Sequence, residues 1–324
     1  MKHFFLINPA AGKGEVQKNL EKQISDAADK IGIEYEIHVT TEVGDAENVV
    51  RKVCESESGN EPIRFYACGG DGTLNEVANG AGGFPFAEIA VIPVGTGNDF
   101  CKNFSNTDTF SDIGAQIRGK SIEIDALKYN GRVCVNVMNM GFDCSVVETV
   151  AKIKRYSWIS SGFAYIAGVI HELIRMPSVK ISKMLIDGEA VEGKKFLLCM
   201  MANGGFYGGG FHSAPLAYID DATIDMCLVK PLSRLSFISL VGGYRKGTFL
   251  EDKRTMKKIF YHKCRRVDIN FESSQSVCFD GEIKSCTELH VEVVPKLLRF
   301  SVPLGSAYKS FNEEKKEQDT AAFI

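Results

Sequence analysis

The chain has 324 residues, of which 44% are hydrophobic and 24% are charged, and its formal net charge is −3. This length favours two domains with a sizeable core, and the balanced charge excludes the strongly basic composition of a nucleic-acid-binding protein. The apolar run at the N-terminus is too short for a signal peptide, and no window reaches the roughly 18 apolar residues that a membrane span needs. We therefore expect a cytoplasmic protein that binds no nucleic acid.

The first third of the chain repeats one pattern, in which an apolar run leads into a glycine-bearing loop and then into an amphipathic run. The apolar runs are predicted strands, at residues 3–7, 35–40, 62–68 and 89–93. The amphipathic runs are predicted helices, from about residue 15 to 30, up to about residue 56, and from the loop at residues 69–75 to Gly80. Strands that alternate with helices predict a parallel sheet, and its loops gather at the carboxyl edge, where open α/β folds bind ligands.

The loop at residues 69–75 reads Gly-Gly-Asp-Gly-Thr-Leu-Asn and joins a predicted strand to a predicted helix. Glycines at such a turn let backbone N–H groups approach a ligand, and the N-terminus of the helix attracts a phosphate group. Asp71 would repel a bare phosphate, so we expect it to hold a magnesium ion through water or to take a proton from an attacking hydroxyl. From these residues alone, the alternative is an ordinary glycine turn in which Asp71 caps the helix.

From about residue 122 the pattern changes to short β-like runs. Turn pairs such as Asn130-Gly131 and Asp187-Gly188 favour hairpins, and we expect an antiparallel sandwich or barrel. One helix, over residues 149–176, interrupts it. That helix is strongly apolar, which is more typical of a core or interdomain helix than of a lipid-facing one. The charged tail from residue 311 is expected to fray.

Neither standard nucleotide-binding fingerprint is present. A Walker loop around Gly12 and Lys13 would need Ser or Thr at position 14, where Gly14 stands. The dinucleotide pattern that starts at Gly95 would need glycine at position 100, where Phe100 stands.

Several motifs occur in the order that one enzyme family shows. Residues 8–12 (Asn-Pro-Ala-Ala-Gly), 69–76 (Gly-Gly-Asp-Gly-Thr-Leu-Asn-Glu) and 93–100 (Pro-Val-Gly-Thr-Gly-Asn-Asp-Phe) resemble the three nucleotide-side motifs of the diacylglycerol kinase catalytic family, which includes sphingosine and ceramide kinases. Later stretches extend the match, at residues 139–143, 202–211, 214–215, 220–221 and 279–282. The resemblance runs from about residue 4 to residue 304.

The resemblance implies ATP-dependent phosphorylation of a lipid hydroxyl. The implied fold class is an N-terminal α/β nucleotide-binding domain, related to those of NAD kinases and phosphofructokinases, and a C-terminal antiparallel β-sandwich. We expect the nucleotide-binding domain at residues 1–122, the lipid-substrate domain at 123–300, and a C-terminal return segment with its tail at 301–324. The implied cofactors are ATP and Mg²⁺, and the partner is a lipid substrate that the enzyme meets transiently at the membrane surface. An exposed sheet edge would support a homodimer.

The resemblance also implies which residues face the nucleotide. Phosphoryl transfer needs donors for the phosphates and carboxylates for Mg²⁺. Asp71 and Asp99 would hold catalytic Mg²⁺, largely through water. The residues implied on the nucleotide side are Asn8, Ala10, Ala11, Gly12, Thr40, Gly69, Gly70, Asp71, Gly72, Thr73, Leu74, Asn75 and Thr96.

One base must also accept the proton of the acceptor hydroxyl. Glu282 is the first choice. Asp280 would share a face with Glu282 if this stretch is extended, so that one acts and the other supports it. Asp71 is the second choice, because the sphingosine kinase branch is usually described that way.

A second, structural Mg²⁺ is implied at a later loop. Its ligands would come from Tyr218, Asp221 and Thr223. The family usually has glycine after the second aspartate of this loop, where this chain has Ala222, so the backbone angles of the loop are open to change.

Two other functions stay open. A kinase for a soluble acceptor such as NAD also uses Gly-Gly-Asp-Gly-Thr, although residues 93–100 and 207–210 favour the lipid branch. A nucleotide-binding regulator without catalysis is the other alternative. Retention of Asp71, Asp99 and Glu282 argues against it, since a pure binder needs no base.

Overall fold

The computed structural model describes residues 1–12, 16–57, 59, 61–95, 97–153 and 161–315. The chain divides into two compact units. Unit 1 comprises Met1–Ala126, Tyr218–Ala222 and Val294–Ile324, and unit 2 comprises Leu127–Ala217 and Thr223–Val293. The predicted fold class is confirmed, because unit 1 is an α/β structure and unit 2 is built on antiparallel strands. Within the described residues, no helix is long and apolar enough to cross a membrane.

Unit 1 is organised around a parallel sheet in the order β2–β1–β3–β4. Its strands are β1 (Lys2–Ile7), β2 (Tyr35–Val39), β3 (Ile63–Gly69) and β4 (Ala87–Pro93). The parallel register places Ile7 beside Val39 and Cys68, and Gly69 beside Pro93. Every residue of β3 is buried, as expected for a central strand that is covered on both faces. The loops that follow β1, β3 and β4 therefore start at the same edge of the sheet.

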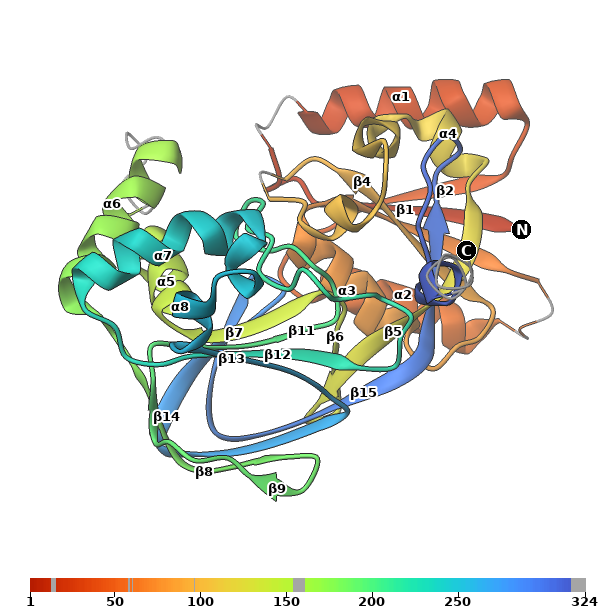
Figure 1. Ribbon diagram of the computed structural model, residues 1–324. Coiled ribbons are helices and arrows are strands. Elements are labelled where there is room, and N and C mark those ends of the chain that lie inside the picture. The colour runs from red at the N-terminus through yellow and green to blue at the C-terminus, as the bar shows by residue number, and fades with distance from the viewer. Residues whose placement is uncertain (13–15, 58, 60, 96, 154–160, 316–324) are drawn as a thin grey trace, which may run out of the picture. The chain divides into compact units, whose positions relative to one another are not determined.

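Helices cover both faces of this sheet. Its helices are α1 (Val16–Ile31), α2 (Asp45–Ser56), α3 (Asp71–Ala81) and α4 (Ile113–Ile117), with 3-10 turns η1 (Phe100–Asn103) and η2 (Thr107–Ser111). In Figure 1, α1 and α4 lie on one face and α2 and α3 on the other. The prediction that Gly80 ends the third helix is wrong. A Cβ atom there would lie 2.7 Å from the Glu47 carbonyl oxygen, so Gly80 allows the close packing of α3 on α2.

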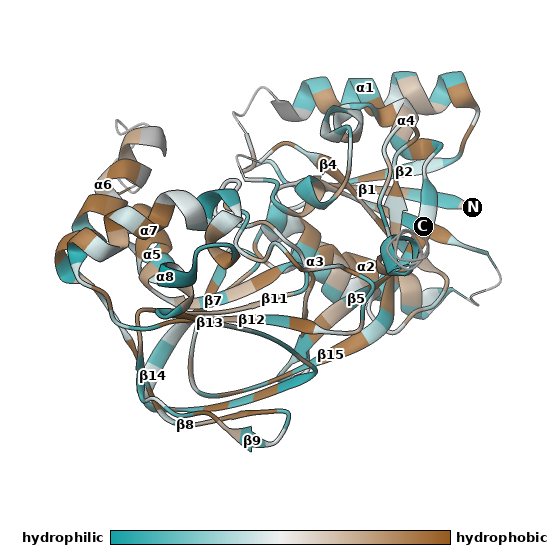
Figure 2. Cartoon of the chain, in the orientation of Figure 1, coloured by the Kyte–Doolittle hydropathy of each residue, from teal (hydrophilic) through white to brown (hydrophobic). Residues whose placement is uncertain are grey.

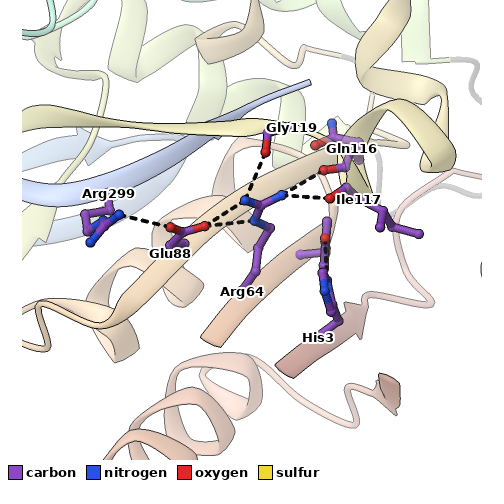
Figure 3. Close-up of polar contacts among 8 residues, drawn as sticks. His3, Arg64, Glu88, Gln116, Ile117, Gly119 and Arg299 are labelled. Atoms are coloured by element: carbon purple, nitrogen blue, oxygen red, sulfur yellow. Dashed lines mark hydrogen bonds and ion pairs between the residues drawn. The ribbon is translucent and has the colours of Figure 1, made fainter. Parts of the chain in front are cut away.

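A buried ion-pair network joins the sheet of unit 1 to the returning end of the chain (Figure 3). The Arg64 guanidinium donates to Glu88 Oε2 at 2.9 and 2.8 Å, and Arg299 donates to Glu88 Oε1 at 3.2 Å. Arg64 also donates to three carbonyl oxygens at the C-terminal end of α4 and just beyond it, those of Gln116, Ile117 and Gly119. Both charges are thus compensated, which a buried pair requires.

Unit 2 is an antiparallel structure with two apolar cores. Its strands are the end of β5 (Lys120–Tyr129), β6 (Arg132–Cys134), β7 (Val137–Gly141), β8 (Val179–Ile186), β9 (Glu189–Ala190), β10 (Lys195–Phe196), β11 (Leu198–Ala202), β12 (Ile224–Val229), β13 (Ile259–Cys264), β14 (Arg266–Phe279) and the first part of β15 (Glu282–Val302). One layer has the order β13–β12–β11–β7–β14. Successive side chains of a strand point to opposite faces of the sheet. Met138 and Met201 therefore lie in one apolar core, to which β8 also contributes, and Val137 and Met200 lie in the second.

The predicted hairpin turns are confirmed. Asn130 and Gly131 have φ angles of 45° and 80°, and Asp187 and Gly188 have 49° and 86°. Positive φ at both central residues is the signature of the tight turns that suit the twist of paired strands.

The helices of unit 2 differ from the prediction. The single helix predicted over residues 149–176 is two helices, α5 (Phe142–Ile153) and α6 (Ser161–Arg175), and residues 154–160 lie outside the described residues. The prediction missed α7 (Arg234–Lys246), whose adjacent Gly242 and Gly243 weaken the helical signal. It also missed η3 (Thr248–Leu250) and α8 (Lys253–Met256). Of the predicted frayed tail, residues 311–315 are helical and the remainder lies outside the described part.

Candidate active site

The glycine loop after β3 turns directly into α3. The N-cap residue of α3 is Gly70, which has no side chain, so the alternative in which Asp71 caps this helix is wrong. A Cβ atom at Gly69 would collide with the Thr73 hydroxyl, so only glycine allows the chain to close over it. The loop and the first N–H groups of α3 offer the backbone donors that suit a phosphate.

The loops after β3 and β4 are joined at this turn. Asp71 Oδ1 accepts hydrogen bonds from the backbone N–H groups of Asp99 at 2.8 Å and Phe100 at 3.3 Å. A Cβ atom at Gly95 would lie 2.7 Å from the Gly70 Cα atom, so the two backbones touch. The predicted nucleotide-side residue Thr96 lies outside the described residues.

The carboxylates of Asp71 and Asp99 share one space beside Gly97. A Cβ atom there would lie 3.0 Å from Asp71 Oδ2 and 3.5 Å from Asp99 Oδ2. Lys102 Nζ donates to Asp99 Oδ1 and, at 2.9 Å, to the Gly97 carbonyl oxygen, which offsets part of the negative charge. Two carboxylate oxygens around a space left open by glycine fit a hard cation such as Mg²⁺.

The loop after β1 reaches the same helix through Asn8. Asn8 Nδ2 donates to the Thr73 hydroxyl at 3.1 Å, and Asn8 Oδ1 accepts from the Ala10 N–H at 2.9 Å. The Ala11 N–H donates to the Asn8 carbonyl oxygen at 3.1 Å, and Gly12 has a left-handed φ of 75°. The structure therefore brings this loop beside the start of α3.

The other predicted nucleotide-side residues lie deeper or further along the sheet edge. Thr40 is buried at the end of β2, and its hydroxyl donates to the Ile7 carbonyl oxygen at 3.3 Å. Leu74 and Asn75 lie on the buried face of α3. Apart from its chain neighbours and the backbone of its own helix, no atom of the described residues lies within 4 Å of a Cβ built at Gly72, so the helix is open at that point.

Asp280, in unit 2, lies in a tight turn. Asp280 and Gly281 have φ angles of 46° and 95° between β14 and β15, so the expectation that this stretch is extended, with Asp280 and Glu282 on one face, is wrong. The Asp280 carboxylate instead binds the last residue of β6 and the segment that follows this strand. It accepts hydrogen bonds from Cys134 Sγ and from the N–H groups of Val135, Asn136 and Val137, at 2.7–3.2 Å.

Glu282 is the first residue of β15, directly after this turn. Its side chain is 22% exposed, and Glu282 Oε2 lies 3.5 Å from Lys284 Nζ. Solvent thus reaches the carboxylate that the sequence predicts as the base.

Asp143 ends one of the motifs of the family resemblance and is a further site candidate beside the predicted site residues. It lies in the first turn of α5, and its Oδ2 atom is buried without a hydrogen bond from any described residue. Asn139, on β7, also has a buried Oδ1 atom that accepts no hydrogen bond from a described residue. Burial raises the pKa of Asp143 to about 7. Asn139 and Asp143 are polar residues at the end of an apolar strand, and this pattern could have predicted them as site residues.

The loop predicted to hold a structural Mg²⁺ is tied into unit 1. Asp220 accepts from the Tyr308 hydroxyl at 2.8 Å, and the Tyr218 hydroxyl donates to Glu314. Ala222 has a φ of 57°, so alanine keeps the left-handed backbone that glycine would allow.

Thr223, the third predicted ligand, begins the next segment of unit 2. Lys263 Nζ lies 3.3 Å from the Thr223 hydroxyl, which places a positive charge at that side chain. Among the described residues, no three His, Cys, Asp or Glu side chains are grouped as metal ligands. The second Mg²⁺ stays a prediction.

Comparisons with known proteins match both units. A model of the diacylglycerol kinase catalytic domain matches residues 2–129, and one of the YegS C-terminal NAD kinase beta sandwich-like domain matches residues 136–302. The chain is 26% identical over 283 residues to a diacylglycerol kinase of Bacillus subtilis, which covers 86% of this chain and 88% of that protein. It is 28% identical over 303 residues to a Salmonella gallinarum protein named "Probable lipid kinase YegS", with 90% and 94% covered.

The fold is also similar to a solved structure of a diacylglycerol kinase from Bacillus anthracis. The TM-score is 0.66 at 23% identity, and the match covers 92% of this chain and 96% of that chain.

Proposed function

The chain belongs to the family of diacylglycerol kinases and YegS lipid kinases, and on that premise we propose that it transfers the γ-phosphate of ATP to a lipid hydroxyl. One observation carries the proposal beyond the family. The loops after β3 and β4 meet beside the N-terminus of α3, where Asp71 Oδ1 accepts a hydrogen bond from the backbone N–H of Asp99. Backbone donors and carboxylates at one sheet edge are what phosphoryl transfer needs, because its catalysis is mostly positioning and charge stabilisation.

In this proposal the glycine loop and the loop after β1 bind the phosphates. Asn8 keeps the two loops together, because its side chain donates a hydrogen bond to the Thr73 hydroxyl. Asp71 and Asp99 would hold Mg²⁺, which when bound neutralises charge on the phosphates. The open space at Gly97 supports this assignment.

Glu282 is the proposed base for the acceptor hydroxyl, with Asp71 as the alternative. The exposure of Glu282 supports it. Asp280 then has a positioning role, since its carboxylate holds residues 134–137 through their backbone N–H groups.

The proposed acceptor is diacylglycerol-like or sphingoid, and the proposed setting is the cytoplasmic face of a membrane, with peripheral and transient association. A soluble acceptor such as NAD is the enzymatic alternative, and an inactive nucleotide-binding regulator is the other.

Label transfer from γ-labelled ATP with Mg²⁺ tests these alternatives. The acceptors are extracted lipids in mixed micelles, NAD, and buffer alone. We expect label in the organic phase, where the labelled species names the acceptor. Label on NAD would instead assign the enzyme to soluble acceptors, and ATP binding without transfer would favour the regulator.

The base is tested separately with Glu282→Gln. We expect lipid phosphorylation to fall at least about 100-fold with ATP binding kept. Glu288→Gln, an exposed residue of the same strand, is the matched control and should keep full activity. Unchanged turnover in Glu282→Gln would pass the role of base to Asp71.

A further inference from the structure

Helix α6 carries a stripe of exposed apolar side chains. Among the α6 positions whose burial the structure describes, Ala164, Gly168 and Glu172 are buried, at a spacing of one helical turn. A Cβ atom at Gly168 would lie 2.8 Å from Val150 Cγ2, so this face packs closely on α5. The opposite side bears large apolar side chains that are 54–64% exposed, namely Phe163, Ile166, Ile170 and Ile174. This exposure contradicts a core helix, one of the two expectations for this segment, while the other, an interdomain helix, stays a prediction.

Helix α7 continues this surface. Leu235 is 81% exposed and Ile238 is 56% exposed, one helical turn apart. Arg234 joins the two helices, because its guanidinium donates to the carbonyl oxygens of Leu173 at 3.2 Å and Ile174 at 2.5 Å. Figure 2 shows hydrophobic residues along both helices. We call the six exposed apolar residues the α6–α7 surface: Phe163, Ile166, Ile170, Ile174, Leu235 and Ile238.

The exposed charged side chains that α6 and α7 themselves carry are all basic. The only acidic residue in the sequence of either helix is Glu172, whose side chain is fully buried and binds Arg175 Nη1 at 3.0 Å. Basic side chains are exposed at the helix ends, namely Arg175, Arg234, Arg245 and Lys246. The chain as a whole is slightly acidic, so this concentration of positive charge is local.

We propose that the α6–α7 surface docks the enzyme on an anionic lipid bilayer, an inference that rests on the proposed lipid-kinase function. Large apolar side chains flanked by Lys and Arg are the pattern of helices that lie in the membrane interface. With 15 and 13 residues, α6 and α7 are about 20 Å long, too short to cross roughly 30 Å of hydrocarbon. A second copy of the chain is a poorer occupant, because a two-fold contact would bring the same basic residues together.

Vesicle flotation of the full chain without ATP tests this docking. The vesicles are pure phosphatidylcholine, or an equimolar mixture of phosphatidylcholine and phosphatidylglycerol. We expect tighter binding to the anionic vesicles, weakened by salt. Ile170→Ser with Leu235→Ser should reduce the partition coefficient at least about tenfold, and Lys246→Gln should reduce it roughly fivefold on anionic vesicles only.

The matched control is Val43→Ser with Leu304→Ser, which removes two exposed apolar side chains from unit 1 and should leave vesicle binding unchanged. The proposal would be overturned if Ile170→Ser with Leu235→Ser lost no more vesicle binding than this control, whether both lost it equally or neither lost any. Equal binding to both vesicle types would also overturn it. A dimer that the double variant turns into a monomer, with vesicle binding intact, would identify the surface as a contact between copies and overturn it as well.

Two further readouts separate this proposal from the proposed function. A dispersed short-chain diacylglycerol needs no bilayer, so the double variant should phosphorylate it at the wild-type rate, and a matching loss there would overturn the docking role. If wild type binds vesicles through these residues but labels no lipid, the docking stands and the proposed function fails.

Discussion

The carboxylate of Asp71 accepts a 2.8 Å hydrogen bond from the backbone N–H of Asp99, across the loops that follow two neighbouring strands. One oxygen atom of Asp71 thus holds the second loop in place, while the other shares the space at Gly97. The structural and the chemical contribution of this side chain can therefore be separated by substitution.

Asp71→Asn should keep the hydrogen bond to Asp99 through the amide oxygen and remove the negative charge. We expect lipid phosphorylation to fall at least about 100-fold, with the Tm close to that of wild type. Asp71→Ala should lose both activity and several degrees of Tm, because the Asp99 N–H loses its acceptor. Label transfer and thermal unfolding measure the two effects. Asp108→Asn, an exposed position of unit 1, is the control, and normal turnover in Asp71→Asn would contradict the assignment.

Gly97→Ala tests whether the shared space of Asp71 and Asp99 is used. The new methyl group would lie 3.0 Å from Asp71 Oδ2 and crowd a cation or its water shell. We expect the Mg²⁺ concentration for half-maximal activity to rise by about tenfold, since Mg²⁺ tolerates little distortion of its shell. Gly242→Ala adds a methyl group where, beyond its chain neighbours and its own helix backbone, no described atom lies within 4 Å, and it should leave the Mg²⁺ titration unchanged. An unchanged Mg²⁺ requirement in Gly97→Ala would contradict the assignment of the cation to this space.

Local sequence predicted the features whose cause is local. The turns at Asn130-Gly131 and Asp187-Gly188 follow from residues that tolerate positive φ. The glycine loop before α3 follows from a strand run, glycines and a helix run in succession.

Features fixed by distant segments were not predictable in this way. Gly80 is explained by Glu47 on another helix, and Asp280 by backbone N–H groups about 145 residues earlier in the chain. Residues 218–222 belong to unit 1 although their neighbours belong to unit 2, which no composition change marks. The exposed stripe of α6 has the same apolar composition as a core helix, and only its packing tells the two apart.

Ala222→Gly should stabilise the protein. Ala222 has a φ of 57°, a backbone conformation that costs an L-residue roughly 1–2 kcal/mol, while glycine costs about 0.5–1 kcal/mol in unfolded-state entropy. We expect a net gain in the free energy of unfolding of about 0.5–1 kcal/mol, measured by urea unfolding. Ala217→Gly, at a position without positive φ, should instead destabilise. A loss of stability in both variants would show that the left-handed angle carries no strain.

Asp143 should make the stability of the fold depend on pH. Burial raises its pKa from 3.8 to about 7 in the folded state. Between about pH 4 and 7 the folded protein therefore holds a proton that the unfolded chain has released. Where the folded state binds more protons than the unfolded chain, a rise in pH lowers the free energy of unfolding. The Asp143 side chain therefore destabilises the fold least near pH 4 and most above pH 7.

Asp143→Asn removes this titration and keeps the shape of the side chain. We expect its Tm to equal that of wild type near pH 4 and to exceed it by several degrees at pH 8, because asparagine has no charge to bury. Asp268→Asn is the control of opposite sign. The hydrogen bond from Arg266 lowers the pKa of Asp268, so its ionised form stabilises the fold, and that variant should lose stability at pH 8 and little at pH 3. A Tm difference between Asp143→Asn and wild type that stays constant from pH 4 to pH 8 would mean that the Asp143 carboxyl group ionises as readily in the folded protein as in the unfolded chain.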